Sequence, residues 1–104
     1  MELTYEQITN NTGVETLFVN NPSGNFVVST DARTIKQGEI YLAIKGENFD
    51  GNNYIEEAIK KGAAGYITSD KTKVFKDAQF GLYAPNTEIA YLEIANFVRN
   101  HINP

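Results

Sequence analysis

Short apolar runs alternate with amphipathic helical segments along the whole of this 104-residue chain. Runs of β-branched and aromatic residues predict strands, and capped segments with an apolar period of about 3.6 residues predict helices. The predicted strands cover residues 14–19, 26–30, 39–45, 65–68 and 80–84, and the predicted helices cover 5–11, most of 52–65 and 87–101. This alternation predicts an α/β fold, with a small mixed, largely parallel sheet flanked by helices.

A turn and two strands refine the expected sheet. The sequence Asn21-Pro22-Ser23-Gly24 has the residues of a type I turn, so the strands on either side of it are expected to form an early hairpin. That hairpin is the reason to expect a mixed sheet and not a wholly parallel one. The apolar runs at 26–30 and 39–45 are both expected near the centre of the sheet.

Two helices have a predicted buried face. In the helix within 52–65, Asn52 or Asn53 is expected to be the N-cap, and Gly62 follows the end of the helix. Its buried stripe is expected to consist of Tyr54, Ile55, Ala58 and Ile59. The buried face of the last helix is expected to include Tyr91, Ile94, Ala95 and Val98.

Composition excludes several classes of function. The chain is long enough for one hydrophobic core, so a single domain over residues 1–104 is expected. Nine basic and thirteen acidic side chains give a net charge of −4, which argues against nucleic-acid binding. No cysteine and one histidine argue against disulfides and transition-metal sites. No apolar run reaches the ~20 residues of a membrane span, and no signal peptide is evident, so a cytoplasmic location without membrane contact is expected.

The first candidate site is the glycine-bounded loop at residues 46–53, between a predicted strand and a predicted helix. Its Gly-x-x-x-x-Gly spacing matches the start of a nucleotide P-loop, but Asn52 and Asn53 replace the Lys and Ser/Thr that bind phosphate and magnesium. Glu47 and Asp50 would also repel a triphosphate, so ATP is not expected here. The loop retains backbone amides at the carboxyl end of a strand, where an uncharged base edge could bind. An ordinary strand-to-helix turn is the alternative interpretation.

The second candidate site is Ser29-Thr30-Asp31-Ala32-Arg33, at the end of another predicted strand. Hydroxyls and one guanidinium in this position could hold a pyrophosphate, because arginine offers a fork of donors that matches phosphate oxygens. Alternatively, Asp31 only forms a turn and Arg33 is its solvent-exposed partner. The two candidate loops can meet only if their strands are neighbours in the sheet.

These two loops carry a resemblance to a known family. The sequence from Ser29 to Gly51, together with Tyr54-Ile55 and residues 58–64, resembles the N-terminal domain of the Mur ligases. Those enzymes use ATP to add amino acids to a UDP-linked peptidoglycan precursor. The sequence Glu47-Asn48-Phe49-Asp50-Gly51 is most similar to the MurF type, which adds D-alanyl-D-alanine to UDP-N-acetylmuramoyl-tripeptide. A MurE-type domain, whose enzyme adds the third residue, and an interaction module with the same fold and no ligand are the alternatives.

The resemblance implies a binding role without catalytic residues or metal ligands in this chain. In the family, the first domain grips the UDP part of the UDP-N-acetylmuramoyl-peptide, while ATP and Mg²⁺ bind a central domain that is absent here. The ligase domains expected to act in cis are absent as well, so this chain alone is not expected to catalyse ligation. The expected contacts to the UDP part are Thr30, Ala32, Arg33, Glu47, Asn48 and Phe49.

Two positions depart from the family pattern. Ala32 replaces the serine that is usual between Asp31 and Arg33, so one hydroxyl bond toward the phosphates is lost. Thr30, Arg33 or a backbone amide would have to compensate. Asn52 replaces the usual histidine after Asp50-Gly51, which keeps a capping side chain but no titratable group.

Overall fold

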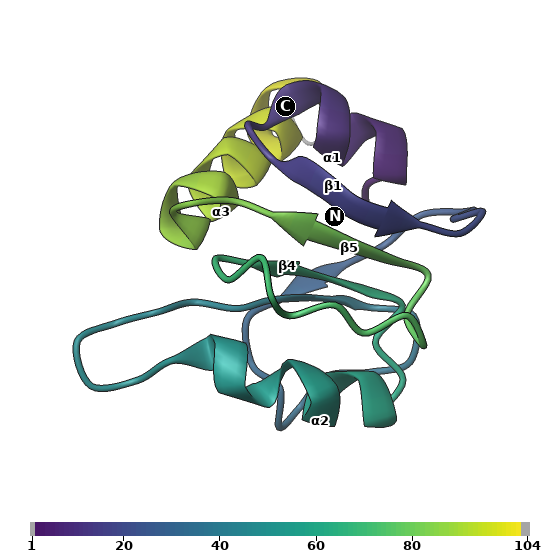
Figure 1. Ribbon diagram of the computed structural model, residues 1–104. Coiled ribbons are helices and arrows are strands. Elements are labelled where there is room, and N and C mark those ends of the chain that lie inside the picture. The colour runs from purple at the N-terminus through teal and green to yellow at the C-terminus, as the bar shows by residue number, and fades with distance from the viewer. Residues whose placement is uncertain (1, 103–104) are drawn as a thin grey trace.

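A five-stranded sheet runs through the middle of the molecule in the order β1-β5-β4-β3-β2 (Figure 1). The structure, a computed structural model, describes residues 2–102. The strands are β1 (Glu15–Val19), β2 (Val28–Ser29), β3 (Ile40–Leu42), β4 (Gly65–Thr68) and β5 (Phe80–Tyr83). β2, β3, β4 and β5 are parallel, and β1 is antiparallel to β5. The predicted mixed, largely parallel sheet is therefore confirmed.

The predicted hairpin across residues 21–24 is wrong. β1 and β2 lie at opposite edges of the sheet, and the mixed character arises because β1 pairs with β5. The segment after the turn pairs with the N-terminal segment and not with β1. Phe26 exchanges two backbone hydrogen bonds with Leu3, at 2.9 and 2.7 Å. β2 is consequently a two-residue edge strand and not the central strand that its composition predicted.

Helices cover both faces of the sheet (Figure 1). α1 (Tyr5–Asn11) and α3 (Thr87–Phe97) lie on one face, and α2 (Ile55–Lys60) lies on the other. α1 begins with a capping box, in which Thr4 and Gln7 satisfy each other's backbone N–H groups. α3 continues into a wider π-type turn, Val98–Ile102. Within residues 2–102, no helix has the length and apolar character needed to cross a membrane.

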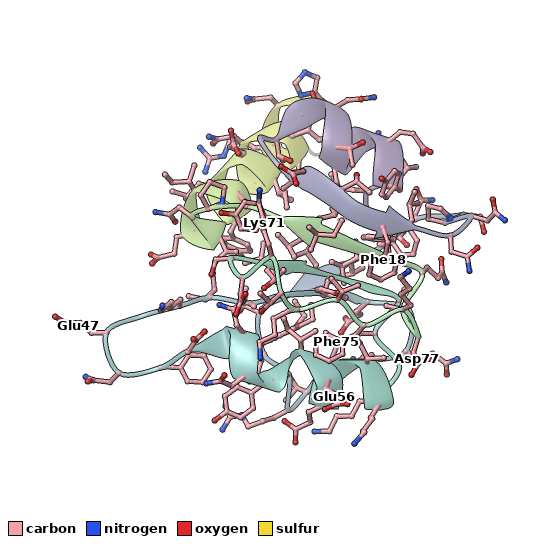
Figure 2. All side chains as sticks on the ribbon, in the orientation of Figure 1. Phe18, Glu47, Glu56, Lys71, Phe75 and Asp77 are labelled. Carbon is pink, nitrogen blue, oxygen red and sulfur yellow. The ribbon has the colours of Figure 1, made fainter. Side chains whose placement is uncertain are left out.

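Two hydrophobic clusters hold these layers together. The larger one fills the space between the sheet and the α1 and α3 helices, and Phe80 lies within it, edge-to-face with Tyr5 and with Phe26. The smaller one lies between the sheet and α2 and is built around Tyr41, Ile55 and Tyr66. Figure 2 shows Phe75 between the sheet and α2, where its ring packs against this smaller cluster.

The start of the second helix differs from the prediction. A 3₁₀ turn, Gly51–Tyr54, precedes α2, and its N-cap is Asp50, whose carboxylate accepts the N–H of Asn52. A 3₁₀ helix has three residues per turn and an α-helix has 3.6. The α-helical spacing of buried residues in α2 therefore does not extend back to Tyr54. Tyr54 is therefore 42% exposed and lies outside the buried stripe, whereas Ile55 and Ala58 are fully buried as predicted.

The buried face of α3 is also shifted. Ala90 and Ile94 of α3 and Val98 at the start of the π-type turn, four residues apart, are buried in the larger cluster. Tyr91 is 38% exposed, contrary to the prediction. Which residues of α3 face the sheet depends on the angle at which the helix packs on it. The apolar period of the sequence does not specify this angle.

The pairing of β2 with β3 positions the candidate site. The two strands are parallel neighbours, with Val28 opposite Ile40 and Ser29 opposite Tyr41. The connection at residues 30–39 contains no helix and crosses below the sheet through the buried Ile35. It turns back at Gly38, whose φ of 87° favours glycine and whose N–H donates to the Gly62 carbonyl. The loops that follow β2 and β3 therefore emerge at the same edge of the sheet.

The larger cluster, between the sheet and the α1 and α3 helices, leaves no room for a side chain at Gly65. A Cβ atom there would lie 2.6 Å from the Phe80 ring, which is completely buried. We expect Gly65→Ala to lower the free energy of unfolding by ~1–3 kcal/mol, the usual cost of overpacking. Urea unfolding measures the change. Gly13→Ala is the matched control, because nothing lies within 4 Å of a Cβ at Gly13. An equal loss of stability in both variants would contradict this account.

Candidate functional site

A cleft of about 540 Å³ lies where the loops after β2 and β3 meet. Its volume falls within the range of small-molecule sites. The cleft is lined by Thr30, Asp31, Ala32, Arg33, Tyr41, Phe49 and Tyr54. The two candidate loops, which could converge only if their strands were neighbours, thus contribute to one concave surface.

The predicted site residues fall into two groups. Thr30, Ala32, Arg33 and Phe49 line the cleft, whereas Glu47 and Asn48 do not. These last two form the tip of a hairpin at residues 45–50, which is closed by hydrogen bonds from Gly46 N to Phe49 O and from Gly51 N to Ile44 O. Figure 2 shows Glu47 at the end of this protruding hairpin, away from the body of the molecule.

In the first loop, Asp31 and Arg33 hold each other. The Asp31 carboxylate accepts the backbone N–H of Arg33 at 2.9 Å and two guanidinium N–H groups at 3.2 Å. The side-chain hydrogen bond from Arg33 is the main reason that the pKa of Asp31 is lowered. The interpretation of Asp31 as a turn former with Arg33 as its exposed partner therefore describes the loop. Within the described residues, the Nη1 edge of the guanidinium has no partner and is available to a ligand.

Ala32 lines the cleft although it is almost completely buried. Its methyl group belongs to the smaller hydrophobic cluster, and the residue is only 5% exposed. Neither the Ala32 N–H nor the Thr30 hydroxyl donates to a protein acceptor among residues 2–102. These two donors and the Arg33 guanidinium lie within four consecutive residues, so the loop offers a cluster of donors to one side of the cleft.

The second loop contributes an aromatic wall. Phe49 and Tyr54 stack with their ring centroids 5.5 Å apart and their planes inclined by 8°. Both side chains are unusually exposed for aromatic residues, at 52% and 42%. The helical period placed Tyr54 in the core and so missed it as a site residue. The signal for its true position was the sequence Asp50-Gly51, where an Asp cap begins the turn earlier than the Asn residues do.

Tyr41 forms the floor of the cleft, and sequence reasoning did not select it. Its hydroxyl donates to the Gly51 carbonyl at 2.9 Å and fastens the base of the 45–50 hairpin to β3. Gly51 is required here, since a Cβ would lie 2.7 Å from the Ile44 carbonyl oxygen and 2.9 Å from the Tyr41 hydroxyl. Burial, with the nearby Asp31 and Asp50 carboxylates, raises the pKa of Tyr41 to about 12.

Asn52 ties the same hairpin to β4. Its side-chain amide donates to Asp50 and to the Ser69 hydroxyl, both at 2.9 Å, and its carbonyl accepts from the Thr68 hydroxyl at 2.6 Å. Asn52 is 4% exposed, its bond from Thr68 is buried, and its bonds to Asp50 and Ser69 are partly buried. Asn52 is therefore a buried cross-link and not the helix cap that the sequence predicted.

The cleft lining carries one cationic side chain, Arg33, and one anionic side chain, Asp31, which are paired at 3.2 Å. Arg33 is at the rim, and Lys61 reaches the same loop, where its ammonium donates to the Arg33 carbonyl at 3.1 Å. No group of three His, Asp or Glu side chains in residues 2–102 is placed to hold a metal ion. The cleft thus combines a flat apolar wall with a cluster of donors, which is an arrangement for binding a ring joined to an anion.

The family of the chain follows from comparison with known proteins. Residues 27–104 match the family described as "Mur ligase family, catalytic domain". The chain therefore belongs to the Mur ligase family, as its loop sequences predicted.

Relatives of two kinds are similar in sequence. The chain is 40% identical over 63 residues to the UDP-N-acetylmuramoyl-L-alanyl-D-glutamate–2,6-diaminopimelate ligase of Rickettsia conorii, covering 54% of this chain and 13% of that protein. It is 31% identical over 77 residues to the UDP-N-acetylmuramoyl-tripeptide–D-alanyl-D-alanine ligase of Haemophilus influenzae, covering 74% and 16%. The chain thus spans about one seventh of the length of these two relatives.

Solved structures of one kind share the fold. MurF from Acinetobacter baumannii superposes with a TM-score of 0.83 and 22% identity over 95% of this chain and 21% of that protein. MurF from Thermotoga maritima superposes with a TM-score of 0.56 and 20% identity over 71% and 17%. The expected likeness to a Mur ligase N-terminal domain, with a fold of the MurF kind, is confirmed.

The buried Asn52 amide gives a test of how the hairpin is held. Asn52→Ala removes the bonds to Asp50, Thr68 and Ser69, so we expect the free energy of unfolding to fall by ~1–3 kcal/mol. Asn53→Ala, at the neighbouring exposed residue, is expected to change it by less than ~0.5 kcal/mol. Urea unfolding of both variants measures the difference. Equal effects would show that the cross-link does not stabilise the fold.

The raised pKa of Tyr41 predicts a pH dependence of stability. In the unfolded chain the hydroxyl ionises near its ordinary pKa of 10, whereas in the folded chain it stays neutral until about 12. Its contribution is therefore fully present below pH 10 and is lost as the pH rises from 10 to 12. We expect Tyr41→Phe to lose less stability than the unsubstituted chain over that interval, although it is ~1 kcal/mol less stable near neutral pH. Parallel curves from urea unfolding would contradict the assignment.

Proposed function

We propose that this chain binds the UDP part of a UDP-N-acetylmuramoyl-peptide, as the N-terminal domain of an ATP-dependent peptidoglycan-precursor ligase. The observation that carries the proposal is the meeting of the two loops at one cleft, with aromatic rings on one side and donors on the other. The printed names of relatives of both kinds begin with UDP-N-acetylmuramoyl, which supports the same class of ligand.

Each half of the cleft matches one half of a uridine diphosphate. The uracil ring stacks on the exposed Phe49 and Tyr54 rings, which offer a flat apolar surface. The diphosphate lies against the first loop, where it accepts from the Arg33 guanidinium, the Thr30 hydroxyl and the Ala32 N–H. In this arrangement the backbone amide of Ala32 takes the place of the hydroxyl that the family's usual serine would supply.

Glu47 and Asn48 contact the proposed ligand only if the 45–50 hairpin changes its position. They lie at the hairpin tip and do not line the cleft. Their expected contact with the polar edge of the base therefore requires the 45–50 hairpin to fold toward the cleft. The two anchors of the hairpin, Tyr41 and Asn52, bond to residues at its base and not to Glu47 or Asn48 at its tip.

We place the chemistry of ligation outside this chain. The 46–53 loop lacks the lysine and hydroxyl of a P-loop, and the Asn52 amide that stands in that position is committed to buried hydrogen bonds. In this proposal ATP and Mg²⁺ bind other domains of the ligase, and this chain binds the UDP part of the substrate. A cytoplasmic location follows from the proposed use of ATP and a soluble UDP precursor.

For the added group we propose D-alanyl-D-alanine. The support is the fold, because the MurF structures superpose over most of this chain, and the Haemophilus influenzae relative matches a longer stretch than the diaminopimelate ligase does. The diaminopimelate ligase of Rickettsia conorii is more similar in sequence to this chain, but over a shorter stretch. The second candidate reaction is therefore addition of the third residue of the precursor peptide.

Titration with UDP tests the proposed ligand. We expect amide resonances of residues 30–33, Phe49 and Tyr54 to shift at millimolar UDP, and Arg33→Ala to weaken binding about tenfold through loss of charge-assisted hydrogen bonds. Arg99→Ala is the matched control, since Arg99 is exposed on the turn after α3 and does not line the cleft. Unchanged spectra at millimolar UDP, or equal weakening by both substitutions, would overturn the proposal.

A further inference from the structure

The Asp31–Arg33 pair leaves the lining of the cleft without a net charge. The guanidinium and the carboxylate lie 3.2 Å apart, and no other Lys, Arg, Asp or Glu among residues 2–102 lines the cleft. A diphosphate in the cleft would therefore approach two charges that largely cancel at a distance. A net positive charge beside the diphosphate has to come from a residue behind the lining.

Lys61 brings a positive charge to this loop from the end of α2. Its ammonium donates to the Arg33 carbonyl at 3.1 Å, across 28 positions of the chain. The hydrogen bonds and charge of Arg33 are the larger reasons that the pKa of Asp31 is lowered, and the charge of Lys61 adds to them. Within residues 2–102, no carboxylate forms an ion pair with the Lys61 ammonium. The first loop therefore meets two cations and one anion.

The end of α2 is fixed against the connection that carries this loop. The Gly38 N–H donates to the Gly62 carbonyl at 2.9 Å. Gly62 has a φ of 110°, and a Cβ there would lie 3.0 Å from the Gln37 Cα, so the two segments pack backbone against backbone. Lys61 is the C-cap of α2, and its own N–H bonds back into the helix. The Lys61 side chain therefore extends toward the loop from a fixed backbone position.

We propose that Lys61 is a positioning residue for the diphosphate of the bound nucleotide. It holds the peptide group between Arg33 and Thr34, and it supplies the positive charge that the Asp31–Arg33 pair does not. Lys61 does not line the cleft, so it acts through the loop and through its electric field and not by contact with the ligand. The inference rests on the proposed function, because it takes a diphosphate to lie against the first loop.

A purely helical role for Lys61 is the competing explanation. Glu57 lies four residues earlier in α2, at the spacing of a helical ion pair. The Lys61 ammonium nevertheless bonds to the Arg33 carbonyl, and no ion pair with Glu57 is present within the described part of the chain. Lys60 is the matched control, because it is the preceding residue of the same helix and is also exposed. Its replacement removes the same charge from the chain.

The experiment titrates the full chain with UDP, followed by calorimetry and amide shifts. Lys61→Ala is expected to weaken UDP binding about threefold, which is the size of an exposed charge interaction. Lys61→Arg keeps both the charge and a donor, so it is expected to bind UDP as the unsubstituted chain does. Lys60→Ala is expected to leave UDP binding unchanged. Added salt is expected to reduce the difference between Lys61→Ala and the unsubstituted chain.

Two further measurements separate positioning from a general effect on the fold. The Thr34 N–H belongs to the same peptide group as the Arg33 carbonyl, so Lys61→Ala is expected to shift the Thr34 amide resonance in the absence of UDP. Lys60→Ala is expected to leave that resonance in place. Uridine, which lacks the phosphates, is expected to bind equally to Lys61→Ala and to the unsubstituted chain.

The outcomes distinguish this inference from the function on which it rests. If the unsubstituted chain does not bind UDP, the proposed function fails and the role of Lys61 fails with it. If UDP binds but Lys61→Ala and Lys60→Ala have equal effects, the positioning role alone is refuted. Failure of Lys61→Arg to restore binding, or a loss of uridine binding equal to the loss of UDP binding, would refute it as well.

Discussion

The parallel pairing of β2 with β3 is the contact on which the site depends. It joins two short strands through Val28 opposite Ile40 and Ser29 opposite Tyr41, and it is extended by the bond from Ile40 N to Val27 O. Without this register the loops after the two strands would emerge at unrelated places. The pairing is small, so the connection between the strands must support it, through buried Ile35 and the Gly38–Gly62 hydrogen bond.

The site has a rigid base and exposed contact groups. The Tyr41 hydroxyl and the Asn52 amide fasten the 45–50 hairpin to β3 and β4 through buried and partly buried hydrogen bonds. The groups left in contact with solvent are the stacked Phe49 and Tyr54 rings and the donors of the first loop. Buried hydrogen bonds thus fix the backbone, while the residues that could touch a ligand remain accessible.

An acidic chain can present a local anion site because the electrostatic effect of exposed charges is short-ranged. At physiological salt, screening confines their influence to about 8 Å, so the net charge of −4 matters less than the charges next to the proposed diphosphate position. Arg33 and Lys61 meet at one loop.

The sequence by itself determined the elements, the fold class and the two loops, because caps, apolar period and turn residues act between near neighbours in the chain. It also placed Thr30, Ala32, Arg33 and Phe49 together at a cleft, once β2 and β3 were assumed to be neighbours. Only the tertiary structure decided that β1 pairs with β5, that Tyr54 and Tyr91 face outward, and that Asn52 is a buried cross-link. Each of these depends on a partner far away in the sequence, on another strand or across the sheet, and such partners are chosen by packing of the whole chain and not by local preference.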